Sequence, residues 1–468
     1  MIKANVEVNP VVLEQAIESL RNYFCDGGFD DLQPSRANAI YTASLTMWLL
    51  IRQRLGGGQS LKETVQRLTR EMPQFVRDNK RIRNGLVSAN TSSYSDARHR
   101  LKLPVIRHAL KKFSDSIIEQ TSPSHGHRWF LLDGTTMTLP PTPELKACFP
   151  PATNQHGESV WPVMMIFVAH EMQSGCAVEP EIGPMYGSKN VSELKMARQI
   201  VKRLPPGSVV MADAGLGIFA VAHGASQAGH DFLLRLSKSR FKSLVKKAEP
   251  IVGNTTWRLS WKPTAKERKT TPSLSSDACL RVDLHRHLTD DGQEIYLVSS
   301  LTDLTGQQLA QQYRRRYDVE NDIRDIKVTM KLEEIRATSK EMVLKEMYAS
   351  LFAYNILIQL RRQVAQIANQ TPRRISFKGV WYMFKPMLQH LLLVRSPEEC
   401  WQEYIDGLHR SAKFDVIPHR PGRSFKRAAH PRRQKTTKWQ KQQRCEKQNR
   451  DSANKRKTKL EPIEIDST

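Results

Sequence analysis

Apolar residues recur at helical spacing through the first quarter of the chain, in segments that glycine-rich stretches separate. These segments cover residues 11–23, 37–55, 61–72 and 104–118. Apolar positions three and four residues apart are the pattern of a helix with one buried face. We therefore expect residues 1–125 to form a helical domain.

Past residue 128 the apolar residues occur in shorter, continuous runs that fit buried strands. The runs are 128–133, 160–169, 176–182, 208–213 and 231–236, with helical patterns at 191–204 and up to about residue 227. The first run ends in Asp133 and the fourth in Asp213. This order predicts a mixed α/β sheet, with a hairpin turn at 171–175.

Residues 238–302 interrupt that alternation. Polar and apolar residues alternate at 257–261, 279–284 and 294–300, which predicts a β-rich insertion with a hairpin turn at 290–292. Helical patterns return after residue 303. The expected fold is multidomain α+β, with the following layout: a helical N-terminal domain (1–125), the first part of a mixed α/β core (126–237), the insertion (238–302), the rest of the core with C-terminal helices (303–410), and a tail (411–468).

Charge suggests the partner. The chain holds 72 Lys and Arg against 47 Asp and Glu, a net charge of +25, with a pI near 9.9. Such an excess is typical of a protein that binds a polyanion, although a generic basic protein is the alternative. Between 419 and 459 acidic residues nearly vanish and no apolar period is present. We therefore expect residues 411–468 to be a disordered basic tail that contacts nucleic acid.

Cysteines and apolar content indicate the compartment. The six cysteines are scattered, without a CxxC pair or zinc spacing, as expected of reduced thiols. The N-terminus lacks the pattern of a secretory signal, and the apolar stretch at 41–55 is interrupted by Arg52 and Arg54. We expect a cytoplasmic, nucleoid-associated protein.

Four residues between 313 and 327 carry the most chemical information. Tyr313, Arg316, Glu320 and Lys327 are spaced by 3, 4 and 7 positions, so on a continuous helix they share one narrow face. A carboxylate beside an aromatic hydroxyl and two cations suits a metal ion next to a phosphate. This face predicts a nucleic acid partner and phosphoryl transfer.

Three acidic residues could meet at such a site: Asp133, Asp213 and Glu320. Two carboxylates at the ends of neighbouring strands and a third on a packed helix could converge on Mg²⁺ or Mn²⁺, two ions about 3.5–4 Å apart. Such a site would activate a water or a 3′-hydroxyl for attack on a phosphodiester. Taken singly, each aspartate also fits a turn residue and the glutamate a solvated side chain.

The spacing Tyr-x2-Arg-x3-Glu-x6-Lys resembles the signature of bacterial insertion-sequence transposases of family four. Residues 131–136 and 209–217 are similar to the segments that bear the first and second catalytic aspartates of that family. The β-rich insertion and the stretch 95–101 also resemble the family, so the resemblance covers most of the chain.

The resemblance implies a ribonuclease-H-like core with an Asp-Asp-Glu triad. Asp133, Asp213 and Glu320 would ligate the metals, and three residues would grip phosphates: Tyr313, Arg316 and Lys327. The implied activity is cut-and-paste transposition, with double-stranded DNA (terminal inverted repeats and target) as partner and a homodimer joining two ends. Ala214 stands where the family often has arginine, which puts one phosphate contact in doubt.

Further DNA contacts are expected at Arg98, Arg235 and Tyr296. Arg98 lies on a basic helix that could equally be an ordinary capped surface helix, and Arg235 could instead pair with an acid in the sheet. Some members of the family flip a base onto an aromatic residue of the insertion; Tyr296 is the candidate, with Trp257 and Trp261 as alternatives. All three aromatics equally fit packing inside the insertion.

Two rival functions remain open. A metal-dependent nuclease of the same fold would cut DNA without joining it. A domesticated protein would bind DNA without cutting, which the presence of all three acids disfavours.

Overall fold

The computed structural model describes residues 28–70, 79–86, 88–155, 157–272, 274–275, 277–289, 292–393 and 398–418. The helix expected at 11–23, part of the turn at 290–292 and nearly all of the basic tail lie outside these ranges. The described residues up to Ile417 belong to one compact unit, Met1–Ile417.

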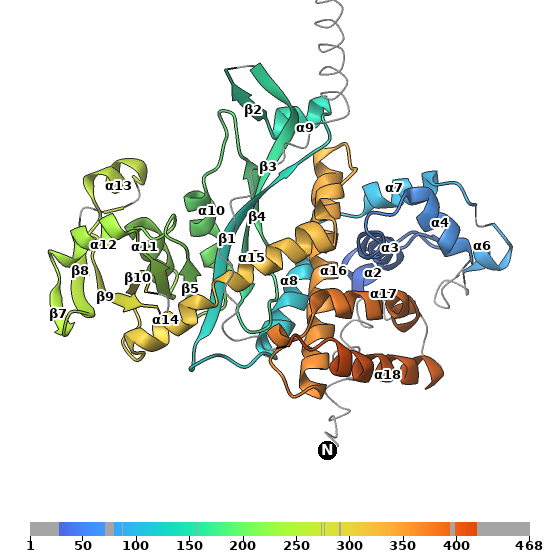
Figure 1. Cartoon of the computed structure of the whole chain (residues 1–468). Coiled ribbons are helices and arrows are strands. Elements are labelled where there is room, and N and C mark those ends of the chain that lie inside the picture. The colour runs from blue at the N-terminus through green and yellow to red at the C-terminus, as the bar shows by residue number, and fades with distance from the viewer. Residues whose placement is uncertain are drawn as a thin grey trace, which may run out of the picture. The chain divides into compact units, whose positions relative to one another are not determined.

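One large mixed sheet forms the centre of this unit (Figure 1). Its order in the described residues is β2-β3-β1-β5-β6-β10-β9-β8-β7, with β4 paired to β3. Strands β1, β5 and β6 are parallel, and the other pairs are antiparallel. The bounds are β1 Arg128–Thr138, β2 Pro151–Asn154, β3 Gly157–Glu171, β4 Glu181–Pro184, β5 Ser208–Ala212, β6 Asp231–Arg235, β7 Glu249–Val252, β8 Thr256–Trp261, β9 Leu280–Leu288 and β10 Glu294–Ser299.

Two strand predictions need correction. β1 does not end at Asp133 but continues to Thr138, because β3 pairs with it from Phe130 to Thr138 and the threonines after Gly134 favour a strand. The strand expected at 176–182 is reduced to β4, Glu181–Pro184, preceded by an isolated bridge from Ala177 to β3.

The β-rich segment at 238–302 continues the same sheet. Its last strand, β10, pairs antiparallel with β6, so that Leu297 lies opposite Arg235. Two short helices accompany these strands: α12 Lys238–Val245 and α13 Ala265–Thr270. The segment therefore extends the sheet beyond β6 by four of the described strands, in the order β10-β9-β8-β7.

Helices cover both faces of the sheet. On one face lie α10 Glu193–Ile200 and α11 Phe219–Gln227. On the other lie α14 Gly306–Arg314 and α15 Tyr317–Arg324, and the odd-numbered residues of β1 and β5 point toward them. The cluster beneath α14 and α15 contains Trp129, Leu131, Val209, Met211, Leu233, Leu297, Leu309, Ala310, Tyr313 and Val319. Strand alternation therefore decides which side chains face α15.

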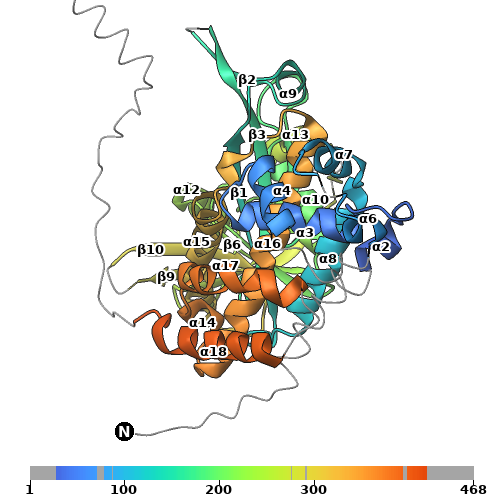
Figure 2. The same ribbon diagram turned by 90° about the vertical axis from the view of Figure 1, so that its right-hand side faces the viewer.

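The helical part of the unit packs around α16, Lys340–Ile367 (Figure 2). Its other helices are α2 Gly28–Leu32, α3 Ala43–Leu55, α4 Leu61–Arg70, α6 Lys80–Arg83, α7 Ser92–Arg100, α8 Leu103–Glu119, α17 Phe377–Leu393 and α18 Glu398–Phe414. The helices expected at 37–55, 61–72 and 104–118 are confirmed as α3, α4 and α8. None of the described helices combines the length and apolar character needed to cross a membrane.

Candidate active site

Three charged residues lie in a row across neighbouring strands, within β1 and at the ends of β5 and β6, on the face that α14 and α15 cover. The registers of β1 with β5 and of β5 with β6 bring Asp133, Asp213 and Arg235 to adjacent positions, each two residues beyond a paired, buried residue. Side chains two positions apart on a strand share a face. We call Asp133, Asp213 and Arg235 the charged row.

The turn after β5 holds Asp213 in place. One of its carboxylate oxygens accepts hydrogen bonds from the backbone N–H groups of Gly215 (2.9 Å) and Leu216 (3.2 Å). A Cβ on Gly217 would lie 1.8 Å from the carbonyl oxygen of Arg235, so only glycine fits where this turn crosses the end of β6. Arg240 donates to the carbonyl of Gly217 at 2.7 Å. The turn therefore fixes the backbone from which Asp213 projects.

Glu320 lies on α15, which packs against β1. Its carboxylate accepts a hydrogen bond from Arg316 at 2.7 Å, and its side chain is 38% exposed. Arg316 also lies over the ring of Tyr317. Burial opposes the charge of Arg316, but Tyr313 and Glu320 outweigh it and raise the pKa of the guanidinium.

The prediction of one continuous helix from 313 to 327 is wrong. The helix α14 ends at Arg314, α15 starts at Tyr317, and residues Asp325–Thr329 form a π-helical turn. At the junction the N–H groups of Arg315 and Arg316 bond three residues back, which tightens the chain. Arg316 and Glu320 still meet, because the four-residue spacing between them lies within helical backbone.

Tyr313 is buried beside the charged row. It is 3% exposed, and burial raises the pKa of its phenol to about 12, so it stays neutral. Arg316 and Arg235 lie near enough to act against that increase. Of the four residues predicted to share one face, Tyr313 and Arg316 thus lie close together, and Arg235 joins them from the sheet.

Lys327 lies in the π-helical turn and is tethered to β1. Its ammonium donates to the hydroxyl of Thr135 (3.1 Å) and the carbonyl of Thr136 (2.9 Å), and it lies 2.9 Å from the carboxylate of Glu333. The side chain is 20% exposed. Its charge is thus already engaged close to Asp133.

The three predicted acids share one electrostatic environment without forming a closed cage. Burial, followed by the charges of Asp213 and Glu320, raises the pKa of Asp133 to about 6, against the N–H of Gly134 and the charge of Arg316. Within the described ranges, no three His, Cys, Asp or Glu side chains lie close enough together to hold a metal ion. In this arrangement Glu320 is turned to Arg316, and the convergence of the three acids to metal-binding distance stays a prediction.

The side chains nevertheless suit a divalent cation in chemistry and direction. Asp133 and Asp213 project from adjacent strands toward the helix that carries Glu320, and all three offer hard oxygen ligands. Like charges held this close, in part buried, favour a cation between them.

A fourth carboxylate, Glu193, escaped the sequence analysis. It begins α10, and one of its oxygens would lie 2.6 Å from a Cβ on Gly134, next to Asp133. Burial and the charge of Asp213 raise its pKa. A glutamate in the first turn after Ser192 looks like an ordinary helix start, and the only available signal was the glycine that leaves room for it.

Arg98 is buried, whereas a side chain that contacts DNA must be accessible at the surface. It is 8% exposed, and its guanidinium is paired with Glu346 of α16 and packed over Tyr94. On α7 it falls on the same face as the buried Tyr94 and Ala97, whereas its neighbours His99 and Arg100 are exposed. Its position therefore corrects the expectation of a DNA contact at Arg98.

Each of the three aromatic candidates of the insertion packs against another aromatic ring. Tyr296 is 7% exposed, and its ring packs at a tilt against that of Phe241, with 4.5 Å between the ring centroids. Its hydroxyl donates to Glu294. Trp261 is 3% exposed, and Trp257 is half-buried against Phe241. Tyr296 also lines a pocket of about 680 Å³ with Arg235, which opens beside the turn after Asp213. The packing alternative therefore describes all three rings in this arrangement.

The chain is similar to known transposases. Residues 124–356 match the family described as Transposase DDE domain. The chain is 24% identical over 351 residues, 73% of its length and 76% of the relative's, to the transposase InsG for insertion sequence element IS4 of Escherichia coli (strain K12).

A solved structure, the cryo-EM structure of a piggyBac transposase synaptic complex with hairpin DNA, covers 91% of this chain and 89% of its own at 11% identity and a TM-score of 0.36. The family match spans all three acids of the site, and the similarity to the IS4 transposase covers most of the chain. The chain therefore belongs to the DDE transposases, in the group of the IS4 element, and is a DNA transposase.

Proposed function

We propose that this transposase acts by cut-and-paste. It would bind the terminal inverted repeats of its element, hydrolyse a phosphodiester to free a 3′-hydroxyl, and join that hydroxyl to target DNA. The observation that carries the proposal is the shared face: Asp133 and Asp213 project toward the helix of Glu320, with Arg316 and Tyr313 at its edge.

In this proposal Asp133, Asp213 and Glu320 hold divalent cations, Mg²⁺ or Mn²⁺ and two in number. The chemistry supplied by cations at such a site is activation of the attacking oxygen and stabilisation of the leaving one. When a phosphate binds Arg316 in place of Glu320, the Glu320 side chain is free to turn toward the two aspartates.

The phosphate contacts fall to cations around that face. Arg235 neighbours Asp213 in the charged row, and Lys327 lies beside β1, so both can reach a backbone that crosses the strand ends. Tyr313 is neutral and buried, which suits a hydrogen-bond donor that approaches a phosphate without adding charge.

We further infer a ribonuclease-H-like core. Three antiparallel strands (β1, β3 and β4) next to two parallel ones (β5 and β6), in the order β4-β3-β1-β5-β6, support that assignment. In this view the segment 238–302 is inserted between β6 and the helix that carries the third acid. We also propose a homodimer, since two transposon ends must be joined.

Replacement of the third acid tests the assignment. With linear DNA that carries the element's own terminal repeats, Glu320→Gln should abolish Mg²⁺-dependent cleavage and leave binding of the ends within about twofold, because it removes a cation ligand and no phosphate contact. Glu63→Gln is the control, since Glu63 is similarly exposed and also paired with an arginine four residues away. Cleavage by Glu320→Gln at the wild-type rate would refute the triad.

Strand joining distinguishes transposition from simple nuclease activity. Pre-cleaved ends with a free 3′-hydroxyl should be inserted into a circular target by the wild type and not by Glu320→Gln. If the wild type hydrolyses DNA but never joins these ends, the nuclease alternative holds.

A further inference from the structure

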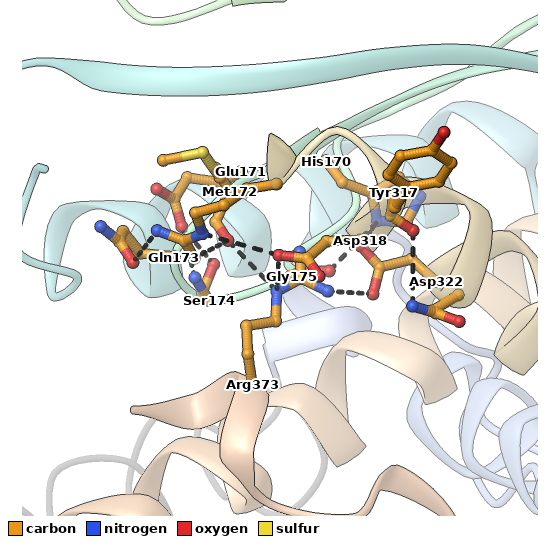
Figure 3. A network of polar contacts seen from close by, with 12 residues as sticks. His170, Glu171, Met172, Gln173, Ser174, Gly175, Tyr317, Asp318, Asp322 and Arg373 are labelled. Atoms are coloured by element: carbon orange, nitrogen blue, oxygen red, sulfur yellow. Dashed lines mark hydrogen bonds and ion pairs between the residues drawn. The ribbon is translucent and has the colours of Figure 1, made fainter. Parts of the chain in front are cut away.

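The helix α15, which carries Glu320, is held by charged side chains that come from segments far apart in the sequence (Figure 3). We propose that Arg373 is a positioning residue which, through Asp318 and Asp322, fixes α15 so that Glu320 faces the charged row. This inference rests on the proposed role of Glu320 as a cation ligand.

The two anchored carboxylates and Glu320 lie on opposite sides of α15. Asp318 and Asp322 are one turn apart and share a face, whereas Glu320, midway between them, is rotated by about 200° from Asp318. Asp322 is 1% exposed, against 38% for the side chain of Glu320. One face of this short helix is therefore held in the protein interior while the other presents Glu320.

Arg373 contacts both anchored carboxylates. It lies in a 3-10 turn, Pro372–Arg374, after α16, and donates through Nη1 to Asp322. Its Nε lies 3.8 Å from Asp318 and donates to the carbonyl of Met172 at 3.2 Å. Burial opposes the charge of Arg373, but Asp322 and Asp318 outweigh it and raise the pKa of the guanidinium. The forked guanidinium thus joins α15 to the end of β3.

His170 closes the other side of Asp322 but carries no charge of its own. The ring is fully buried, and burial lowers its pKa. Its Nδ1 lies 3.1 Å from the carbonyl of Gly175 and 3.6 Å from Asp322, and it packs edge-on against Tyr354. Since a carbonyl can only accept, Nδ1 carries the hydrogen. Among the described residues, Arg373 is therefore the cation that hydrogen-bonds Asp322.

The turn after β3, residues 171–175, also contacts Arg315 and leaves space for Arg373. Arg315 donates to Gln173 (2.9 Å) and to the carbonyl of Met172 (3.2 Å), and lies 3.6 Å from Asp318. Gly175 has φ of +84°, and a Cβ there would lie 3.2 Å from the guanidinium of Arg373. The turn at the end of β3 is thus shaped to receive Arg373.

The test compares cation binding with stability and DNA binding. The full chain would be titrated with MnCl2, free Mn²⁺ being measured by paramagnetic resonance, and cleavage of the end DNA would be followed against Mn²⁺ concentration. Arg373→Lys keeps the charge but cannot contact Asp322 and the Met172 carbonyl together. We expect it to raise the half-saturating Mn²⁺ concentration about tenfold, with end binding unchanged. Asp322→Asn should do the same.

Two controls separate positioning from general destabilisation. Glu346→Gln removes the carboxylate of the other buried arginine pair, on α16, and should lower the melting temperature without changing Mn²⁺ affinity. In a Glu320→Gln background, Arg373→Lys should cause no further loss of Mn²⁺ affinity, since it acts through Glu320.

The inference is overturned if Arg373→Lys binds Mn²⁺ like the wild type, or if Glu346→Gln weakens binding equally. Should Arg373→Lys fail to fold, Asp318→Asn leaves the Arg373–Asp322 pair intact and must still raise the half-saturating concentration; an unchanged value refutes the proposal. A wild type that neither binds Mn²⁺ nor cleaves would instead refute the proposed function.

Discussion

Asp325 in the π-helical turn between Glu320 and Lys327 is expected to destabilise the folded protein at neutral pH. Burial, followed by the charge of Asp322, raises the pKa of this carboxyl from 3.8 to about 6, against Arg361, Arg324 and a hydrogen bond from Thr329. Because the folded-state pKa is the higher one, the unfolded chain loses its proton first as the pH rises. The contribution of this carboxyl to the stability of the folded protein is therefore most favourable below pH 4, and it falls as the pH increases toward 6.

The magnitude follows from that difference. The folded-state and unfolded-state pKa values differ by about 2.2, and each pKa unit corresponds to about 1.36 kcal/mol. Asp325 therefore lowers the free energy of unfolding by on the order of 3 kcal/mol at pH 7.5 and by about half of that at pH 5. Asp325→Asn removes the charge and can still accept the hydrogen bond from Thr329, now 3.2 Å long. It should stabilise the protein by up to that amount at pH 7.5 and by less at pH 5.

Urea unfolding of wild type and variant at both pH values measures the difference. Asp115→Asn is the control, since its carboxylate is 39% exposed and its replacement should change stability by less than about 0.5 kcal/mol at either pH. If Asp325→Asn lowers stability at pH 7.5, or its gain does not grow with pH, then the arginines hold this carboxylate charged and the burial argument is wrong.

Two further substitutions probe the turn after β5 and the charged row. Gly217→Ala should cost more than about 3 kcal/mol and lower the melting temperature sharply, since its Cβ would lie 1.8 Å from a backbone carbonyl, whereas Gly224→Ala in α11 meets only a flexible arginine side chain and should be nearly neutral. Arg235→Gln should weaken binding of end DNA and reduce the dependence of log affinity on log salt concentration by about one; Arg203→Gln, whose guanidinium is paired with Glu181, should leave that slope unchanged.

Local patterns predicted part of the arrangement of the acids: Asp213 directly follows the end of β5, as expected, whereas β1 continues past Asp133. Asp133 and Asp213 each follow an apolar run, and strand alternation places both on one face once the two strands are neighbours and parallel. The pairing of Arg316 with Glu320 also follows from their four-residue spacing. These parts depend on periodicity, which is visible in a single sequence.

Contacts between distant segments were not predictable in the same way. Arg98 and Arg373 are both arginines in basic stretches, and only the fold shows that each meets a buried carboxylate, at Glu346 and Asp322. The burial of Tyr296 depends likewise on Phe241, which reaches it from a separate helix. A basic residue or an aromatic ring carries no sign of such a partner. The sequence therefore placed Arg98 on a surface helix and left Tyr296 open between a DNA contact and packing inside the insertion.

The break between α14 and α15 allows the four signature residues to differ in burial, which one straight helix would not. A continuous helix would carry all four signature side chains on one stripe, yet Tyr313 must be buried over the sheet while Glu320 remains partly open to solvent. The tight turn at Arg315 and Arg316 lets α14 pack down with Tyr313, and α15 then takes its direction from carboxylates on its far side. The orientation of Glu320 thus depends on residues outside the signature, and mutations at the end of β3 should alter the active site without touching it.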